Sequence, residues 1–357
     1  MNSWPITLAT DKKPKPAADQ LGFGKYFTDH MLLMDYTDGL GWHHPRIVPY
    51  GPLVLDPSAM VLHYGQEVFE GMKAYRTPQG NIALFRPDMN LRRMNESCSR
   101  ISMPQVDTQQ VLEVIRQLIE LEKDWVPEGE GNSLYIRPFM IATEAGLGVR
   151  ASSEYQLIVI LSPVGAYYAE GIHPVRIYVE DQYVRAVRGG TGEAKTSGNY
   201  AAGIKAQEVA KEFGFSQVLW LDGIENRYVE EVGSMNVFFK IGDEVITPEL
   251  NGSILAGITR NSVISLLEEW GITVKQRKIS ISELFEAHEA GTLLEAFGTG
   301  TAAVISPIGS MQWEGREIEI CGGQTGELSQ RLYDTLTGIQ RGDREDPRGW
   351  RYTVCEA

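Results

Sequence analysis

Apolar side chains recur with helical spacing at several places along the chain. Residues 108–124 give the clearest case, because their apolar positions fall three and four apart and share one helix face. Helices are also expected over residues 200–213 and 259–270. A capping box at 280–283 opens a fourth helix, which Gly291 ends.

Short, continuous apolar runs predict β-strands in both halves of the chain. The longest covers residues 155–161 and is followed by a serine and a proline. Beyond it, the pattern predicts strands at 175–180, 183–187, 218–221 and 237–241. Because strands and helices are mixed without repeats in both halves, the predicted fold class is α+β.

Length and turn residues indicate how these elements divide into domains. The chain has 357 residues, about the length of two domains. Glycines and a proline between residues 164 and 174 favour a connection there. We therefore expect a mobile N-terminal arm, an α+β domain, an interdomain loop and a second domain, at residues 1–20, 21–164, 165–174 and 175–357.

Charge and cysteine content exclude several classes of protein. Lys and Arg number 33 against 47 Asp and Glu, a formal net charge of −14, so nucleic acid is not an expected partner. The three cysteines lie far apart and the six histidines show no metal-binding spacing, which indicates reduced thiols and no metal site. No apolar stretch is long enough to span a bilayer and the N-terminus has no signal sequence, so we expect a cytoplasmic protein without membrane contact.

Three glycine-rich segments carry the candidate chemistry. Residues 189–196, GGTGEAKT, nearly match the phosphate-binding loop GxxxxGK[ST], but Ala194 replaces its second glycine and residues 197–199 are expected to interrupt the helix it needs. Residues 298–303, GTGTAA, match a dinucleotide fingerprint, yet the run after them cannot form the required helix. Residues 255–260, LAGITR, precede a helix and would expose backbone N–H groups to an anion.

These segments acquire a common explanation if the protein binds pyridoxal 5′-phosphate (PLP). Lys195 stands in a turn of small residues and has no evident structural role. A buried lysine with a lowered pKa, a phosphate cradle and a carboxylate for the pyridine nitrogen are what a PLP enzyme requires. Glu231 lies between expected strands and is the candidate carboxylate. A nucleotide-binding protein built on the near-match loop is the alternative from a different class.

The chain resembles the branched-chain amino acid aminotransferases, which are class IV aminotransferases of the fold-type IV PLP enzymes. The resemblance covers nearly the whole chain and implies a smaller N-terminal and a larger C-terminal domain with PLP at their interface. It rests on ordered motifs that include LHYGQEVFEGMKAYR (62–76), LFRPDMNLRRM (84–94), SLYIRPF (133–139), KTSGNY (195–200), EVGSMNVF (231–238), LAGITR (255–260) and FGTGTAA (297–303).

For the cofactor, the resemblance implies that Lys195 holds PLP covalently and, once released, moves a proton. Glu231 would pair with the pyridine nitrogen, and Tyr200 would form a hydrogen bond with the ring hydroxylate. The other cofactor contacts would be made with the phosphate, by Arg93, Ile258, Thr259, Thr301 and, ten residues before the lysine, Arg185.

For the substrate, the resemblance implies an aromatic pocket that accepts both an aliphatic side chain and the distal carboxylate of glutamate. Arg137 and Tyr64 would serve that carboxylate, because an arginine at the rim can pair with it or stay in water. Ser234 and the backbone N–H of Ala302 would receive the α-carboxylate. The side-chain pocket would be lined by Phe23, Phe69, Tyr135, Leu147, Val149 and Tyr167, with Leu147 and Val149 contributed by a partner subunit.

The activity implied is reversible amino transfer from L-leucine, L-isoleucine or L-valine to 2-oxoglutarate, which gives the branched 2-oxo acid and L-glutamate by a ping-pong mechanism. A homodimer is expected, because two subunits complete each pocket. A D-amino acid aminotransferase or an aminodeoxychorismate lyase of the same fold is the alternative within the family. Ala303 and Ser306 stand where eukaryotic relatives carry a redox CxxC, so that thiol switch is not expected, and Ser234 stands where many relatives have threonine.

Overall fold

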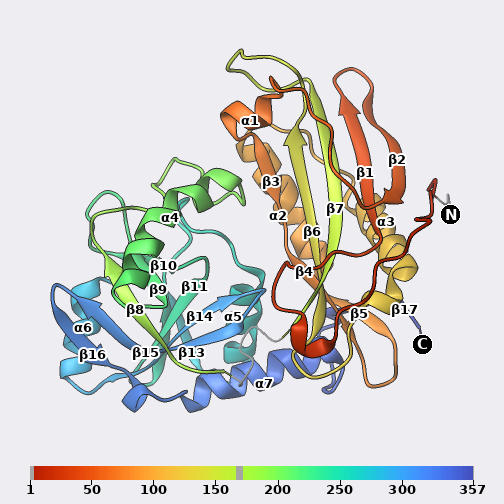
Figure 1. Ribbon diagram of the computed structural model, residues 1–357. Coiled ribbons are helices and arrows are strands. Elements are labelled where there is room, and N and C mark those ends of the chain that lie inside the picture. The colour runs from red at the N-terminus through yellow and green to blue at the C-terminus, as the bar shows by residue number, and fades with distance from the viewer. Residues whose placement is uncertain (1–3, 166–171, 357) are drawn as a thin grey trace. The chain divides into compact units, whose positions relative to one another are not determined.

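The computed structural model describes residues 4–165 and 172–356, which group into two compact units (Figure 1). The first comprises Met1–Ala169, Ala194–Ser197 and Gly338–Ala357, and the second comprises Glu170–Glu193 and Gly198–Thr337. The segment that carries Lys195 thus groups with the first unit, although its sequence neighbours on both sides belong to the second. The domain bounds expected from the sequence remain a prediction.

An eight-stranded antiparallel sheet forms the centre of the first unit. Its order is β17-β5-β4-β6-β7-β1-β2, with β3 paired to β6. The strands are β1 (His30–Thr37), β2 (Gly41–Pro49), β3 (Glu67–Phe69), β4 (Met72–Arg76), β5 (Ile82–Phe85), β6 (Ser133–Ala142), β7 (Glu154–Val164) and β17 (Arg351–Cys355). The helices of this unit are α1 (Met60–Tyr64), α2 (Pro87–Arg100) and α3 (Thr108–Leu121), with short 3₁₀ turns at Ala18–Gln20 and Lys123–Trp125.

Side-chain alternation along β6 separates the core from the candidate site. Leu134 and Ile136 point into a core that also contains apolar residues of α2 and α3. Because successive side chains of a strand point to opposite faces, Tyr135 and Arg137 lie on the other face. Phe69 of β3 is directly opposite a β6 residue of that second face, so it lies there too. The sheet therefore presents these three side chains on one surface.

The described part of the N-terminal arm is bound to the first unit. Ile6 pairs with Ile47 in an isolated bridge, and the backbone N–H of Ala9 donates to Nε2 of His30 at 2.8 Å. Lys13 donates its backbone N–H to Asp29 at 2.8 Å. These contacts pair backbone groups of the arm with the sheet, and the mobility of the arm remains a prediction.

A nine-stranded mixed sheet forms the second unit, in the order β10-β9-β8-β15-β14-β11-β12-β13 with β16 paired to β15. The strands are β8 (Val175–Glu180), β9 (Gln217–Leu221), β10 (Val229–Val232), β11 (Asn236–Ile241), β12 (Glu244–Thr247), β13 (Thr273–Gln276), β14 (Leu293–Gly300), β15 (Val304–Trp313) and β16 (Arg316–Glu319). The helices are α4 (Ser197–Glu212), α5 (Ile258–Glu269), α6 (Ile281–Glu289) and α7 (Glu327–Arg341), whose last residues group with the first unit, and a 3₁₀ turn covers Cys321–Gly323.

The periodic segments of the sequence form the predicted elements with small shifts of their ends. The helix predicted at 108–124 is α3, which begins where Asp107 caps the N–H groups of two glutamines. Ser280 caps α6 by accepting from the N–H of Glu283 at 3.1 Å, as the capping box predicts. The strand predicted at 183–187 is wrong, since these residues form no strand.

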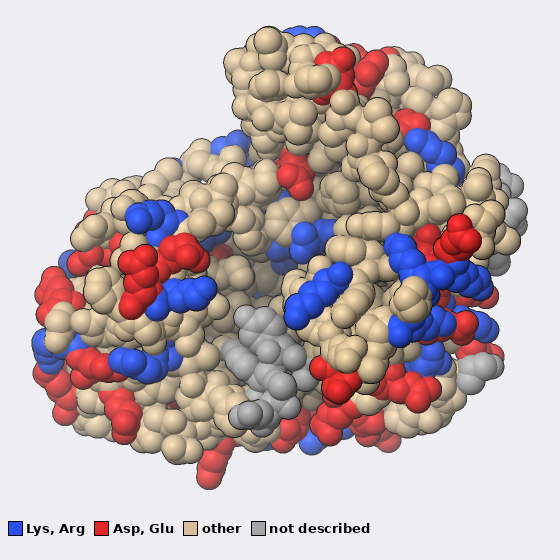
Figure 2. Space-filling model, in the orientation of Figure 1, with Lys and Arg blue, Asp and Glu red and all other residues tan. Residues whose placement is uncertain are grey.

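The mixture of strands and helices in both units confirms the α+β class. Acidic and basic side chains are interspersed on the face shown in Figure 2. Among the described residues, no helix is long and apolar enough to cross a bilayer. Cys98, Cys321 and Cys355 are free thiols, and burial raises the pKa of Cys98 to about 12.

Candidate active site

The segment that carries Lys195 is held against β3 by its backbone. Lys195 donates its N–H to Ser97 at 2.9 Å, and its carbonyl accepts from the N–H of Phe69 at 3.0 Å. Thr196 bridges to Val68 and donates its hydroxyl to a backbone carbonyl of β3 at 2.7 Å. These contacts fix the main chain on both sides of the side chain and leave the amine to face the sheet surface.

The amine of Lys195 lies over an aromatic ring in a desolvated environment. Its Nζ is 4.6 Å from the ring centroid of Phe69. Burial, with the nearby positive charge of Arg93, lowers the pKa of Lys195 from 10.5 to about 8, although Glu70 opposes the shift. A substantial fraction of the amine is therefore uncharged, and only the uncharged amine is a nucleophile.

Arg93 is held in a buried ion pair with Glu70. Its Nε and Nη2 donate to the two carboxylate oxygens at 2.7 and 2.9 Å, and Asn90 donates to the same carboxylate at 2.7 Å. Arg93 is 7% exposed and Glu70 is fully buried. The bidentate geometry fixes the plane of the guanidinium beside Lys195.

Aromatic rings and Arg137 share the sheet face described above. The guanidinium of Arg137 lies 4.7 Å from the ring centroid of Phe69 and donates to the hydroxyl of Tyr135 at 3.1 Å. Phe23 packs edge-on against Tyr135 with centroids 5.0 Å apart. A Cβ on Gly71 would lie 2.0 Å from the Tyr135 hydroxyl oxygen, so the glycine is required for this packing.

Three further residues predicted for the substrate pocket are exposed in the single chain. Tyr64 is 41% exposed and donates its hydroxyl to the carbonyl of Leu147. Leu147 and Val149 are 64% and 85% exposed in the loop between β6 and β7. Tyr167, also predicted for this pocket, lies outside the described residues.

In the second unit, Glu231 is fixed by two contacts. Oε1 accepts from the N–H of Leu255 at 2.8 Å, and Oε2 forms an ion pair with Nε of Arg185 at 3.3 Å. Arg185 also donates to the carbonyls of Gly192 and Ser253. Both side chains are at most 9% exposed, so the pair is a desolvated one. The guanidinium of Arg185 is therefore paired with the carboxylate of Glu231 in this structure.

Two of the glycine-rich turns meet near Glu231. Gly257 precedes α5, which has no side-chain cap on its first N–H groups at Ile258 and Thr259. A Cβ on Gly257 would lie 1.9 Å from Asn236, whose amide donates to Leu255. Because Asn236 is in register with Thr299 of β14, the turn after β14 is joined to the same cluster. The uncapped helix N-terminus is an anion-binding arrangement.

The remaining predicted residues of this unit lie on turns or at a helix start. Thr301 and Ala302 occupy the turn between β14 and β15, so the GTGTAA segment joins two strands and opens no helix, as its context predicts. Ser234 is exposed in the turn between β10 and β11. Tyr200 lies in the first turn of α4, which begins at Ser197, so the expectation that residues 197–199 interrupt a helix is wrong.

Two buried charged residues at the site were missed by sequence reasoning. Glu70 follows Phe69 directly, but its pairing with Arg93 joins positions 23 residues apart and has no local signal. Lys73 is 7% exposed and in register with Tyr135, and burial lowers its pKa to about 8. A charged residue within a strand motif is the signal that could have identified both.

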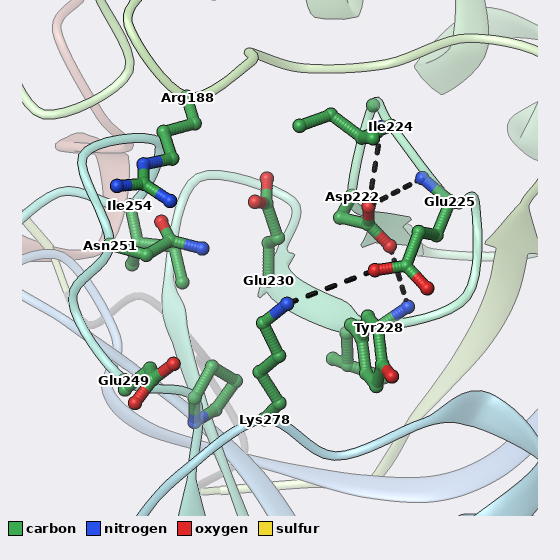
Figure 3. A pocket seen from close by; sticks show the side chains of 13 residues that line it. Arg188, Asp222, Ile224, Glu225, Tyr228, Glu230, Glu249, Asn251, Ile254 and Lys278 are labelled. Atoms are coloured by element: carbon green, nitrogen blue, oxygen red, sulfur yellow. Dashed lines mark hydrogen bonds and ion pairs between the residues drawn. The ribbon is translucent and has the colours of Figure 1, made fainter.

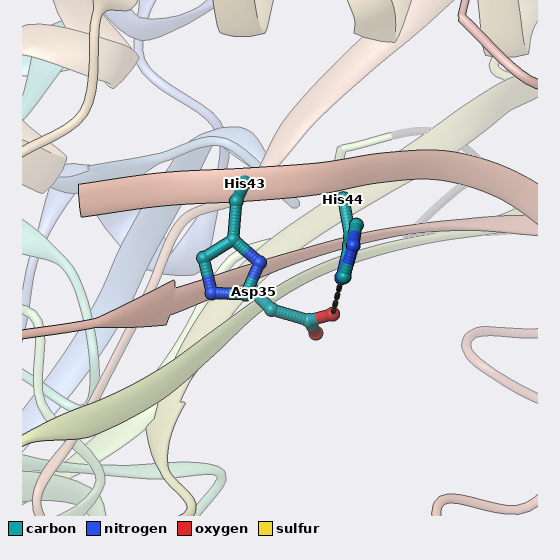
Figure 4. Close-up of side chains that lie close together, drawn as sticks. All are labelled: Asp35, His43 and His44. Atoms are coloured by element: carbon teal, nitrogen blue, oxygen red, sulfur yellow. Dashed lines mark ion pairs between the residues drawn. The ribbon is translucent and has the colours of Figure 1, made fainter. Parts of the chain in front are cut away.

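One cluster of the described residues has metal-ligand spacing. Asp35, His43 and His44 on the β1–β2 hairpin place their ligand atoms within 4.8 Å of one another (Figure 4). The oxygens of Asp35 already accept from Arg46 at 2.7 Å and from Gln156 at 2.8 Å. A cation would have to displace a guanidinium, so we assign this cluster to the hairpin's own ion pair.

The comparisons with known proteins agree with one another. Residues 67–311 match the family described as amino-transferase class IV. The chain is 61% identical over 350 residues to branched-chain-amino-acid aminotransferase 2 of Bacillus subtilis, covering 98% of this chain and 96% of that protein. It is 59% identical over 343 residues to a probable branched-chain-amino-acid aminotransferase of Staphylococcus aureus, covering 96% of each.

Solved structures give the same result. The branched-chain amino acid aminotransferase of Escherichia coli has a TM-score of 0.77 at 27% identity and covers 92% of this chain and 99% of its own. The T.th. branched-chain amino acid aminotransferase, solved with pyridoxamine 5′-phosphate, has a TM-score of 0.74 at 27% identity and covers 90% and 98%.

The chain belongs to the class IV aminotransferases and, within them, to the branched-chain amino acid aminotransferases. It is an enzyme that transfers the amino group of branched-chain amino acids. The resemblance given by the sequence motifs is confirmed. The D-amino acid aminotransferase, the lyase and the nucleotide-binding protein are not favoured. Class IV aminotransferases in general use PLP.

Proposed function

We propose that this enzyme binds PLP through Lys195. The observation that carries the proposal is the amine itself, which faces the ring of Phe69 and has a pKa of about 8. The donor chemistry of the chain fits the group: an uncharged amine for the aldehyde, a carboxylate for the pyridine nitrogen and N–H groups for the phosphate. When bound, PLP supplies an electron sink for the amino acid's α-carbon.

The proposal assigns a residue contact to each polar group of the cofactor. Glu231, which forms an ion pair with Arg185, would hold a proton on the pyridine nitrogen. Tyr200 would form a hydrogen bond with the ring hydroxylate. The phosphate would be bound by the side chains of Arg93 and Thr301 and by the N–H groups of Ile258 and Thr259, whose helix has no side-chain cap.

The substrate side of the proposal assigns two kinds of contact. Phe23, Phe69 and Tyr135, with Tyr167, would surround an aliphatic side chain. Arg137 would pair with the distal carboxylate of glutamate, and its buried Nε, which has no hydrogen-bond partner in the described part of the chain, supports this role. The α-carboxylate would be received by Ser234 and the N–H of Ala302, and Tyr64 would serve the distal end.

The overall reaction we propose is reversible amino transfer from L-leucine, L-isoleucine or L-valine to 2-oxoglutarate. The kinetics would be ping-pong, with L-glutamate as the second product. Lys195 would hold the cofactor and, through its Nζ, would act as the base that moves the proton at the α-carbon. A cytoplasmic location remains a prediction.

The amino donor tests this function directly. We expect L-leucine, L-isoleucine and L-valine to support glutamate formation from 2-oxoglutarate at least about a hundredfold faster, in kcat/KM, than D-alanine, because about 2.7 kcal/mol of side-chain and stereochemical discrimination is available in such a pocket. Glutamate formation is followed with each donor at equal concentration. Equal or faster turnover of D-alanine would show that the substrate assignment is wrong.

We also propose a homodimer, because the exposed loop with Leu147 and Val149 would complete a partner's pocket. An exposed apolar side chain in a loop favours burial in such an interface. We expect light scattering after size-exclusion chromatography to give the mass of two chains. We expect Val149→Asp to raise the KM for L-leucine, with Val54→Asp, at an equally exposed loop position, as control. A monomer with full activity would contradict the proposal.

A further inference from the structure

A cavity in the second unit lies outside the residues assigned above. It has a volume of about 120 Å³, and its walls come from the turn after β9, from β10, from the 248–254 loop and from Lys278 (Figure 3). Glu230 forms its floor, and its neighbour Glu231 does not line it. The residues that line the cavity therefore differ from those of the Glu231 cluster, which includes Arg185 and Leu255.

Several charged groups around the cavity already have partners. Asp222 accepts hydrogen bonds from four backbone N–H groups of the turn that follows it. Glu225 forms an ion pair with Lys278 at 3.8 Å, and Lys278 also lies over the ring of Tyr228. These groups line the rim of the cavity. A ligand could bind strongly to them only by breaking the hydrogen bonds and the ion pair that they already form.

Glu230 is different, because half of its carboxylate is unsatisfied. The side chain is 4% exposed; Oε1 accepts from the hydroxyl of Ser253, and the buried Oε2 has no hydrogen-bond partner within residues 4–165 and 172–356. Burial raises the pKa of Glu230 and the charge of Glu231 adds to the rise, whereas Ser253, the charge of Arg185 and Asn251 oppose it. A buried carboxylate oxygen without a partner costs free energy that a bound cationic group would recover.

The remaining residues that line the cavity indicate which other chemical groups a ligand would carry. Arg188 and Glu249 line the cavity, and no ion pair or side-chain hydrogen bond engages either of them among the described residues. Val229, Pro248 and Ile254 supply apolar wall. The volume corresponds to roughly eight to ten water positions, which is the size of a small amino acid.

We propose that this cavity binds a small aliphatic amino acid as a zwitterion, with its ammonium group on Glu230, its carboxylate on Arg188 and its side chain against Ile254. The site is distinct from the proposed active site and needs no cofactor. An ammonium group supplies the hydrogen-bond donor that Oε2 lacks, and a carboxylate matches the fork of an arginine. A bare metal ion fits less well. Its positive charge would repel Arg188, and the apolar wall of the cavity would remain in contact with water.

The test uses 2-aminoisobutyrate as the probe, because its α-carbon has no hydrogen and it cannot be transaminated. Isothermal titration calorimetry on the full-length enzyme is expected to show one saturable site per chain, with a dissociation constant on the order of millimolar. Glu230→Gln is expected to weaken binding at least about tenfold, since it removes the charge that pairs with the ammonium group. Isobutyrate, which lacks the amine, is expected not to compete.

Glu268→Gln, an exposed carboxylate on α5, is the matched control and is expected to bind as the wild type does. Arg188→Ala, a surface change that leaves the buried residues intact, is expected to weaken binding about tenfold and serves if Glu230→Gln does not fold. No binding by the wild type, or binding that neither variant weakens, would overturn the proposal, because the second result places the probe elsewhere. Turnover of the amino donors is measured in a separate assay. A negative result in the binding test therefore does not contradict the proposed transamination.

Discussion

Replacing Lys195 by alanine is expected to lower the rate of glutamate formation from L-leucine and 2-oxoglutarate by at least about 10⁴-fold. The variant loses the nucleophile and the base in one change, and such groups act as a unit. The fold is expected to survive, because Lys195 is held through its backbone contacts with Ser97 and Phe69. Burying the charged amine of Lys195, whose pKa is lowered, opposes folding. Thermal unfolding of the Lys195→Ala variant is therefore expected at the same temperature as that of the wild type or at a higher one.

The pKa of Lys195 gives a second readout that needs neither substrate nor cofactor. With a pKa of about 8, roughly one amine in ten is uncharged at pH 7, against about one in three thousand for a lysine at 10.5. In cofactor-free enzyme, acylation of Lys195 is expected to rise with pH through a midpoint near 8. Mass spectrometry of the labelled peptides separates it from Lys73, which has a similar pKa.

Lys205 on α4 is the matched control for the rate measurement. It is exposed, so we expect Lys205→Ala to keep the wild-type rate. A Lys195→Ala enzyme that retains more than about a hundredth of the activity would contradict the catalytic assignment. An acylation midpoint of Lys195 near 10.5, the ordinary value for a lysine, would contradict the desolvated environment independently.

The elements that the sequence predicted well are those with a local cause. The periodic apolar face of 108–124 and the capping box at Ser280 act within a few residues, and both form as expected. The strand expected at 183–187 has no such local cause, because a β-strand forms only where a neighbouring strand can pair with it. Glu180 instead accepts the N–H groups of Gln182 and Tyr183 at 2.8 and 2.9 Å, and these contacts close a turn.

The start of α4 shows the opposite effect, in which tertiary contacts override propensity. Ser197, Gly198 and Asn199 are poor helix formers, yet the helix begins there. Thr191 donates its hydroxyl to Asn199 at 2.7 Å, and the Asn199 amide donates back to the Thr191 carbonyl at 2.8 Å. This pair ties the glycine-rich loop to the helix, and nothing in the local pattern signals it.

The candidate site also contains residues that a local sequence motif identifies and residues whose contacts no local motif signals. Ordered motifs identified the residues now seen around Lys195, including Phe69, Arg93 and Tyr135, because each motif is a continuous stretch of sequence. Glu70 stands inside one of those motifs but acts through Arg93, and Arg185 acts through Glu231. Such pairings exist only after folding, so no local sequence pattern signals the pair of Arg185 with Glu231 or that of Glu70 with Arg93.

The buried pair of Glu70 and Arg93 has the largest expected effect on stability. Glu70→Ala leaves the guanidinium of Arg93 in place with 7% exposure and without its bidentate partner, and also removes the acceptor of Asn90. An uncompensated buried charge costs about 3–5 kcal/mol. We expect a loss of that size in the free energy of unfolding, measured by urea denaturation of cofactor-free enzyme.

A second Glu–Arg pair of the same unit provides the control. Arg116 donates to both oxygens of Glu113 on α3, but these side chains are 24% and 34% exposed, so Glu113→Ala is expected to cost less than about 1 kcal/mol. Combining Glu70→Leu with Arg93→Met is expected to recover part of the loss, because the buried charge is removed along with its partner. Equal losses for Glu70→Ala and Glu113→Ala, or a double variant less stable than Glu70→Ala, would show that desolvation of Arg93 does not control the stability of this unit.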